Sequence, residues 1–250
     1  MEDSLFARLK SAFAPKSSQP RTTMAGFVQW LAPKLRISAV YDVGAATGTF
    51  SRLCNPLWPR ADFFLFEPLS EFQDDLLAVT REIRHSTVLP FALLDFDGEM
   101  ELNVHPDLEG SSVFKEIEGG LVDGFPRTVA CRTLDRWFKS DCFRLVKLDV
   151  QGAEIRALDG AQSFFEAPVP DTQSETVFIV EVNLYENMIG SENLFSRVVS
   201  YFQHRNFELL DIAGICRRPL DDALAQTDLV FCHRESRLRR EKAFATKSSV

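Results

Sequence analysis

Three ionisable residues lie near the ends of two apolar runs, where they could bind a substrate or accept a proton from it. Lys147 and Asp149 belong to the run 143–150, and a strand would place both side chains on one face. Glu181 ends the apolar part of the run 176–182, and it lies beside Asp149 if the two strands are neighbours. A carboxylate within hydrogen-bonding distance of a hydroxyl group can accept its proton during a transfer reaction. Structural ion pairing is the alternative interpretation of these three residues.

A loop of small residues follows an earlier apolar run that ends at Asp42 and Val43. Gly44 and Gly48 permit a tight turn and close approach of the backbone, while Ala45 keeps side-chain bulk out. Such a loop at the carboxyl end of a first strand can hold a nucleoside-type cofactor. Its GxxxG spacing differs from the GxGxxG that binds a pyrophosphate, which favours a phosphate-free sulfonium methyl donor over NAD or FAD. A tight strand–helix turn without a ligand is the alternative interpretation.

Glu67 follows the apolar run 61–66 and lies roughly 25 residues after Asp42. In dinucleotide-binding folds, an acidic residue at a comparable place accepts hydrogen bonds from the ribose hydroxyls. Pro68 then ends the strand, because proline has no amide hydrogen for the ladder. We therefore expect Glu67 and Pro68 to lie at the cofactor site, although a solvated loop acid would also explain Glu67.

These residues must be positioned by an alternation of strands and helices. Strand-like runs cover residues 37–43, 61–66, 86–94, 143–150, 176–182, 207–212 and 228–232, and helix-like runs cover 49–57, 69–84, 153–165 and 193–205. Strands that alternate with helices predict an α/β fold with a mostly parallel seven-stranded sheet and helices on both faces. The strand runs are short and nearly continuously apolar, as strands covered on both sides should be.

One stretch, residues 97–132, interrupts this alternation before the fourth strand of the sheet. It contains two hairpin-like runs, 99–105 and 127–132, around a glycine-rich segment at 109–124. Because that segment offers few anchors for a rigid core, we expect a mobile lid on the acceptor side of the site. His105 in this β-rich insertion is a more distant candidate for the proton acceptor.

The two ends of the chain differ from its middle. Residues 1–36 predict a helical N-terminal extension, in which Thr22 or Thr23 caps a helix. Residues 37–233 predict the main domain, which includes the insertion. Residues 234–250 are polar and basic without a sustained apolar face, and they predict a tail.

Composition bears on the partners. The chain has 28 Lys and Arg against 36 Asp and Glu, a net charge of -8, whereas nucleic acids are held largely through Lys and Arg. This balance favours a small, weakly charged acceptor over DNA or RNA.

No apolar run approaches the roughly 20 residues that span a bilayer, and no secretory signal is recognisable, so we expect a cytoplasmic protein. Five scattered cysteines and unclustered histidines predict reduced thiols and no metal site, while the oligomeric state is not indicated.

Several motifs together resemble the FkbM-type methyltransferase family. They are YDVGAATGTFS (41–51), FLFEP (64–68), RTLD (132–135), VKLDVQGAE (146–154) and IVEVN (179–183), in the family's order and intervals. The resemblance covers about residues 38–183. It implies a Rossmann-like class I methyltransferase fold, S-adenosylmethionine as the cofactor, and O-methylation of a hydroxyl group on a sugar or other natural-product scaffold.

The resemblance also assigns roles to individual residues. It implies that Asp42, Gly44, Gly48 and Glu67 hold the cofactor and that Asp149 lies at the methyl-transfer end. This sequence departs from the family pattern where Gln151 replaces a frequent Glu, so neither a carboxylate role nor a metal ligand is carried over there. It also has Ala46-Thr47 where Asn and an aliphatic residue are common, which indicates altered fine contacts rather than lost binding.

Rival functions agree less well with the sequence. An enzyme that methylates nucleic-acid amines needs an Asn/Asp-Pro-Pro-aromatic loop after the fourth strand, where this chain has Asp-Val-Gln-Gly. A short-chain dehydrogenase needs Tyr and Lys four residues apart, which none of the three tyrosines provides. A non-catalytic cofactor-binding or scaffold module with the same fold stays the alternative function, and a turnover assay separates the two.

Overall fold

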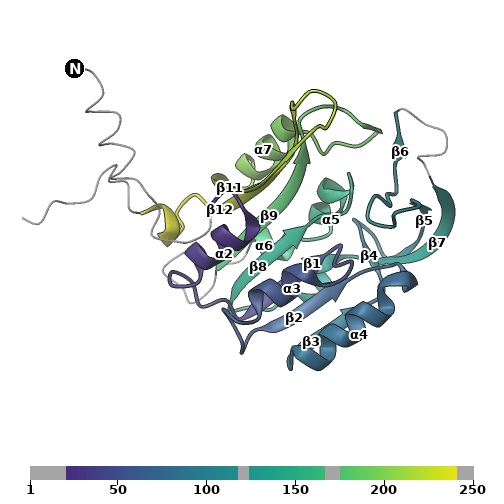
Figure 1. The fold of residues 1–250 in the computed structure, drawn as a ribbon. Helices are drawn as coiled ribbons and strands as arrows, with labels where there is room; N and C mark the ends of the chain where they lie inside the picture. Colours follow the sequence, from purple (N-terminus) through teal and green to yellow (C-terminus); the bar gives the residue numbers. More distant parts are fainter. Residues whose placement is uncertain (1–20, 118–123, 167–174, 241–250) are drawn as a thin grey trace, which may run out of the picture.

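A central sheet with helices on both faces organises the computed structural model, which describes residues 21–117, 124–166 and 175–240 (Figure 1). The sheet strands are β1 (Ala39–Val43), β2 (Asp62–Phe66), β3 (Ser86–Leu89), β8 (Phe143–Leu148), β9 (Glu175–Asn183), β11 (Phe207–Arg217) and β12 (Leu224–His233). The helices are α2 (Met24–Leu31), α3 (Thr49–Cys54), α4 (Gln73–Glu82), α5 (Glu154–Asp159), α6 (Gln162–Glu166) and α7 (Phe195–Gln203). Single 3-10 turns are η1 (Ser70–Phe72), η3 (Leu134–Trp137) and η4 (Arg237–Arg239).

The strand order is β11-β12-β9-β8-β1-β2-β3. The pairs from β9 through β3 are parallel, whereas β12 is antiparallel to both β9 and β11. The predicted α/β fold with a mostly parallel seven-stranded sheet is therefore confirmed. Because β1 lies between β2 and β8, the loops that follow these three strands meet at one edge of the sheet.

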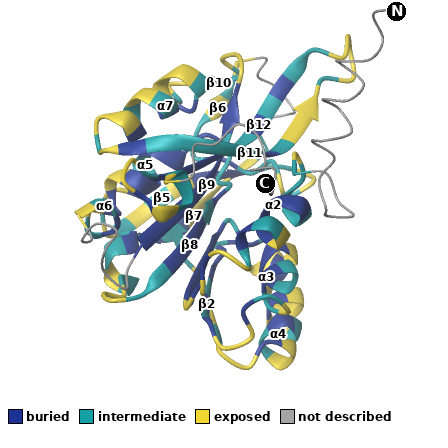
Figure 2. Cartoon of the chain, turned by 90° about the vertical axis from the view of Figure 1, so that its left-hand side faces the viewer, coloured by how far each residue is buried: buried dark blue, intermediate teal, exposed yellow. Residues whose placement is uncertain are grey.

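Two apolar layers hold the helices to the sheet. On one face, α2, α3 and α4 contribute buried residues such as Phe27, Phe50 and Val79 to a shared core. On the other face, α5, α6 and α7 bury residues such as Phe164 and Phe202. Figure 2 shows the buried strands between these helix layers. Strands covered on both sides are nearly continuously apolar, which explains why their positions could be read from the sequence.

The insertion forms small sheets beside the main one. Its three-stranded sheet has the order β4-β7-β5, with β4 at Ala92–Leu93, β5 at Gly98–Val104 and β7 at Phe125–Arg132. The predicted hairpin-like runs correspond to β5 and β7, which pair in antiparallel fashion. A second pair joins β6 (Lys115–Glu116) of the insertion to β10 (Met188–Ile189), which follows β9. Residues 118–123 of the predicted lid lie outside the described residues.

Two predicted elements are divided in the structure. The run 86–94 is not one strand, because Pro90 interrupts it and only β3 joins the main sheet, while β4 pairs with β7. The helix predicted over 153–165 is divided into α5 and α6 at Gly160. A β-carbon on this glycine would overlap the carbonyl oxygen of Leu94, so the backbone just after β4 approaches the chain at the break.

The N-terminal extension contributes to the core. Thr23 caps α2, as predicted, by accepting a hydrogen bond from the Gly26 amide at 3.1 Å. Residues 1–20 of the extension and 241–250 of the tail lie outside the described residues. Across the part of the chain that is described, the structure contains no helix with the length and apolarity needed to cross a membrane.

Candidate functional site

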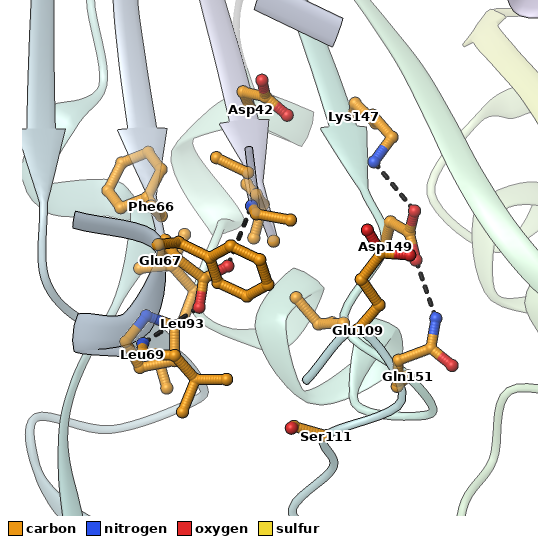
Figure 3. Close-up of a pocket in the computed structure, with 18 of the residues that line it drawn as sticks. Asp42, Phe66, Glu67, Leu69, Leu93, Glu109, Ser111, Lys147, Asp149 and Gln151 are labelled. Atoms are coloured by element: carbon orange, nitrogen blue, oxygen red, sulfur yellow. Dashed lines mark hydrogen bonds and ion pairs between the residues drawn. The ribbon is translucent and has the colours of Figure 1, made fainter. Parts of the chain in front are cut away.

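A cavity of about 490 Å³ lies at the carboxyl ends of β1, β2 and β8 (Figure 3). It is lined by every predicted site residue except one, namely by Asp42, Gly44, Ala45, Glu67, Pro68, Lys147, Asp149 and Glu181. The exception is Gly48, which stands at the N-cap of α3 and is absent from the lining. The predicted residues at these strand ends therefore line one cavity, and Gly48 shapes the turn instead of the cavity wall.

The small-residue loop is a turn fixed by its own backbone. The amides of Gly44 and Ala45 both donate to the Phe66 carbonyl at 3.0 Å, which ties the loop to the end of β2. Ala46 has a φ of 45°, in the left-handed region that favours Gly or Asn. Asn, which is frequent at this position in the family that the sequence resembles, suits that conformation. Ala46 therefore makes this turn less stable than Asn would.

Glu67 fastens the same loop with its carboxylate. One oxygen, Oε2, accepts from the Ala46 amide at 2.9 Å, and the other, Oε1, accepts from the Leu69 amide at 2.9 Å. The side chain is buried, and burial raises the pKa of Glu67 above its usual value. Glu67 thus holds the loop and Pro68 at the cavity wall while each carboxylate oxygen keeps a further lone pair.

Asp42 is held from the opposite side of the loop. Its Oδ2 accepts from the Ser51 amide at 3.1 Å and from the Ser51 hydroxyl at 2.7 Å. Its Oδ1 is buried and has no hydrogen-bond partner among the described residues. Burial raises the pKa of Asp42 to about 6. A buried carboxylate oxygen without a partner carries an energetic cost that a ligand donor would relieve.

At the other side of the cavity, Lys147 and Asp149 form an ion pair. The Nζ of Lys147 lies 2.9 Å from Oδ2 of Asp149, which confirms that both side chains share one face. The Lys147 side chain is 12% exposed and that of Asp149 is 31% exposed. The lysine is therefore covered, while the carboxylate faces the cavity (Figure 3).

Glu181 lies beside Asp149, as the strand argument predicts. The parallel register pairs Leu148 with Val180, so the next residues, Asp149 and Glu181, are level. The Nε2 of Gln151 joins them, at 2.9 Å from Oδ1 of Asp149 and 3.0 Å from Oε2 of Glu181.

The two carboxyl groups have opposite pKa directions. Burial alone would raise the pKa of Asp149, but the Lys147 ammonium and the hydrogen bonds it receives lower it below its usual value. Burial and the charge of Asp149 raise the pKa of Glu181 to about 9. Burial would lower the pKa of Lys147, but Asp149 and Asp42 raise it. At neutral pH the set therefore contains a carboxylate at Asp149 and a carboxylic acid at Glu181.

Sequence reasoning missed two residues next to this set. Asp228 on β12 pairs in register with Glu181, and burial raises the pKa of Asp228 to about 6. Gln226 on the same strand donates from Nε2 to Oε2 of Glu181 at 3.4 Å. The sequence signal for both residues was the predicted strand run 228–232, which corresponds to β12. That run begins at Asp228, four residues after the first residue of β12, so Gln226 lay outside it.

Glu154 has a structural role behind the site. Its Oε1 accepts from the amides of Val150 and Gly152, at 3.0 and 3.3 Å. The side chain is fully buried, its Oε2 has no partner among the described residues, and burial raises the pKa of Glu154 to about 8. This carboxyl group organises the loop that carries Gln151.

The insertion contributes its own side of the cavity. Glu109 and Ser111 line it, whereas His105 is absent from the lining and its Nδ1 lies 2.6 Å from Asp107. The expected scarcity of anchors is wrong for Ser112, which is buried and donates from Oγ to the Gln151 carbonyl at 2.6 Å. Within the described residues, no three His, Cys, Asp or Glu side chains are grouped to hold a metal ion.

Comparisons with solved structures give distant similarities. Methyltransferase FkbM from Methylobacillus flagellatus KT is 12% identical with a TM-score of 0.48, over 79% of this chain and 44% of that one. A putative methyltransferase from Streptococcus mutans, in complex with SAH, is 9% identical with a TM-score of 0.44, over 82% and 94%. A SAM-dependent O-methyltransferase from Thermotoga maritima is 10% identical with a TM-score of 0.43, over 92% and 71%. This chain thus spans less than half the length of the Methylobacillus chain.

The sequence itself gives a clearer result. No curated protein sequence matches the chain. A family model described as the methyltransferase FkbM domain matches residues 42–209, which is more than half of the 250 residues. The matched segment begins at Asp42 and contains the loop, Glu67, Asp149 and Glu181, and it folds as a Rossmann-like class I methyltransferase sheet. The chain therefore belongs to the FkbM methyltransferase family.

Proposed function

We propose that the protein transfers a methyl group from S-adenosylmethionine to a hydroxyl group of a small acceptor, such as a sugar or another natural-product scaffold. The observation that carries this proposal is one shared cavity, lined by the small-residue loop and Glu67 on one side and by Asp149 on the other. A donor bound along the loop would therefore meet an acceptor at Asp149.

The cofactor side fits a nucleoside without phosphates. Glu67 has lone pairs for ribose hydroxyls, and Oδ1 of Asp42 is a buried acceptor without a donor. Apolar residues such as Leu69 and Leu93 line the cavity near Glu67 and could pack against a base (Figure 3). Among the described residues, Lys147 is the one Lys or Arg of the lining, and Asp149 already pairs with it, so a pyrophosphate would find no free cation.

The acceptor side supplies a proton acceptor. When bound, the sulfonium cofactor supplies a methyl group that is already activated, so the protein has to orient the acceptor and remove its proton. A hydroxyl group is a weak nucleophile at neutral pH, and the carboxylate of Asp149 can take its proton. Glu181, whose pKa is raised to about 9, is protonated at that pH and suits hydrogen-bond donation. Asp149 is therefore the stronger candidate of the two.

The charge of the lining supports a neutral acceptor. Among the described residues, five acidic side chains line the cavity, namely Asp42, Glu67, Glu109, Asp149 and Glu181, against Lys147, which is paired; of the five, Glu181 is neutral at neutral pH. An anionic acceptor such as a phosphorylated sugar or a nucleic acid would meet repulsion there. This agrees with the overall net charge of -8.

Calorimetry and a turnover assay test the proposal together. We expect micromolar-range binding of S-adenosylmethionine and of its demethylated product, and no binding of NAD. Incubation with methyl-labelled S-adenosylmethionine and a host metabolite extract should then yield labelled neutral small molecules by mass spectrometry. Tight NAD binding without sulfonium binding would overturn the cofactor assignment, and label confined to RNA or protein would overturn the acceptor class. Cofactor binding with no label in any fraction favours the non-catalytic alternative.

A further inference from the structure

One amide nitrogen contacts both carboxyl groups at the acceptor side. The Nε2 of Gln151 lies 2.9 Å from Oδ1 of Asp149 and 3.0 Å from Oε2 of Glu181. A primary amide nitrogen has two hydrogens and no acceptor, so both carboxyl oxygens accept from it. The Nε2 of Gln226 donates to the same Oε2 of Glu181 at 3.4 Å. Two amide donors thus meet at Oε2 of Glu181.

The backbone of Gln151 is held in an unusual conformation. Its φ is 50°, and that of Gly152 is 98°, so both residues are in the left-handed region. Two serine hydroxyls fix the loop from different segments. Ser112 of the insertion donates to the Gln151 carbonyl at 2.6 Å, and Ser191 after β10 donates to the Gly152 carbonyl at 2.9 Å. A strained non-glycine residue persists where its surroundings over-determine it, and such residues cluster at functional sites.

We propose that Gln151 is a positioning residue, whose amide holds the carboxyl groups of Asp149 and Glu181 in one fixed arrangement with Asp149 directed to the reacting hydroxyl. This role rests on the proposed function, in which Asp149 accepts the proton. The amide cannot take up or release a proton near neutral pH, so it joins the two groups without itself acting as an acid or a base.

The surrounding charges explain why an amide suits this chain at position 151. The charged and titratable groups around the pair are Lys147 on β8, Asp42 on β1, Asp228 on β12, Glu154 at the start of α5 and Glu109 of the insertion. Lys147 is the one cation in this set, and it already offsets Asp149. A carboxylate at 151 would add a second negative group within hydrogen-bonding distance of the Asp149 carboxylate, beside an already protonated Glu181, and one of these two carboxylates would have to bind a further proton.

The experiment titrates the two carboxyl groups in the ligand-free protein, which needs no acceptor. Aspartate and glutamate side chains carry ¹³C at the carboxyl carbon, and Asp149→Asn and Glu181→Gln assign their signals by loss. In wild type we expect the Glu181 signal to titrate far above the Asp149 signal. In Gln151→Met, which keeps the length but removes both donors, the Asp149 midpoint should rise by about one pH unit.

Two further variants separate the bridge from general effects. Gln151→Asn keeps the amide and suits the left-handed backbone, but it is one methylene too short to reach both acids, so it should also raise the Asp149 midpoint. It keeps the test available if Gln151→Met does not fold. Gln226→Met is the matched control, because it removes an amide from the same Oε2 of Glu181 without contacting Asp149. The Asp149 midpoint should not move in this control.

The outcomes distinguish this inference from the proposed function. An Asp149 midpoint that stays at its wild-type value in both Gln151 variants overturns the positioning role, even where methyl transfer is observed. A shifted midpoint in a protein that methylates nothing in the extract supports the bridge and overturns the proposed function instead. When an acceptor has been identified, the acidic limb of the plot of kcat against pH should move to higher pH in Gln151→Met. The shift should equal the rise of the Asp149 midpoint in the carboxyl titration.

Discussion

Gly44 lies so close to Asp149 that a β-carbon on the glycine would overlap the carbonyl oxygen of the aspartate. The amide of Asp149 in turn donates to the carbonyl of Val43 at 3.1 Å. The small-residue loop and Asp149, which are about a hundred residues apart in the sequence, are therefore in direct backbone contact. A shift in one must displace the other.

Replacing Gly44 should damage both halves of the site. Gly44→Ala adds a β-carbon at a φ of 73° and against the Asp149 carbonyl, so we expect a loss in unfolding free energy of more than about 3 kcal/mol. Gly190→Ala is the control, because its φ is 82° but its β-carbon would lie 4.0 Å from Phe114, so only about 1–2 kcal/mol should be lost. Urea unfolding measures both values, and equal losses would contradict the steric argument.

Removing the negative oxygen pair of Glu67 should weaken cofactor binding. Glu67→Gln replaces one acceptor by an amide donor, so it cannot accept from both Ala46 and Leu69 and also bind ribose hydroxyls. We expect a loss of about 1.5–3 kcal/mol in the binding free energy of S-adenosylmethionine, measured by calorimetry. Glu71→Gln is the control, since this nearby carboxylate pairs with Arg127 outside the cavity. Equal affinity in Glu67→Gln and wild type would remove Glu67 from the cofactor site.

Part of the fold and most of the site could be predicted because a doubly covered parallel sheet leaves a strong pattern. Apolar runs with an acidic residue at the end predicted Glu67, Asp149 and Glu181 at one edge. Breaks were harder to predict, because the pairing of β4 with β7 and the close approach of Leu94 to Gly160 are contacts between distant segments. No local pattern announces that a strand leaves one sheet for another.

The contacts of the Gln151 amide with Asp149 and Glu181 could not be predicted from the sequence for a similar reason. Its sequence signal is one amide where the family often has an acid, which says nothing about the two oxygens that it contacts. The contact depends on a left-handed backbone that the hydroxyls of Ser112 and Ser191 fix from separate segments. Such long-range hydrogen bonds have no period or spacing in the sequence.

The part of the insertion that faces the cavity should respond to ligands. The Phe114 amide donates to Oγ of Ser112, which itself donates to the Gln151 carbonyl, so the segment 108–117 is tied to the loop that carries Gln151. We expect hydrogen exchange there to slow when the demethylated cofactor binds, and to slow further with an acceptor. Ser112→Ala should speed exchange in 108–117 while β1 and β2 keep their protection. Exchange that neither ligand changes would argue against a lid.

Glu154 should make the fold less stable as the pH rises. Its pKa is about 8 in the folded chain against 4.5 for the ordinary group, so the folded state keeps a proton that the unfolded chain releases. This stabilisation is complete below pH 4.5 and is lost as the pH rises towards 8, at up to about 1.4 kcal/mol per pH unit. Glu154→Gln should make the decline in unfolding free energy shallower by that slope between about pH 5 and 8.

Urea titrations at several pH values measure this slope. Asp42, Glu181 and Asp228 also have raised pKa values, so part of the decline should persist in the variant. Glu82→Gln is the control, because this exposed partner of Arg52 has a lowered pKa and titrates below the window. A Glu154→Gln slope identical to wild type would show that Glu154 is ionised in the folded protein.

Asp149→Asn tests the proton acceptor directly. The change keeps the shape and removes the charge, so we expect the single-turnover rate to fall by about 10²–10⁴-fold. The rate is measured with an acceptor that the labelled-methyl assay has identified. Glu181→Gln replaces a neutral acid by a neutral amide and should cost about tenfold or less.

Stability measured on the same Asp149→Asn sample separates catalysis from ion pairing. Lys147 loses its partner at 2.9 Å but keeps the charge of Asp42 nearby, so the unfolding free energy should fall by only about 1–3 kcal/mol. A purely structural Asp149 would also give a less stable protein, but its folded fraction would turn over at the wild-type rate. That result would remove Asp149 from the chemistry and leave Glu181, which releases its proton at about pH 9, as the remaining carboxyl group that could accept one.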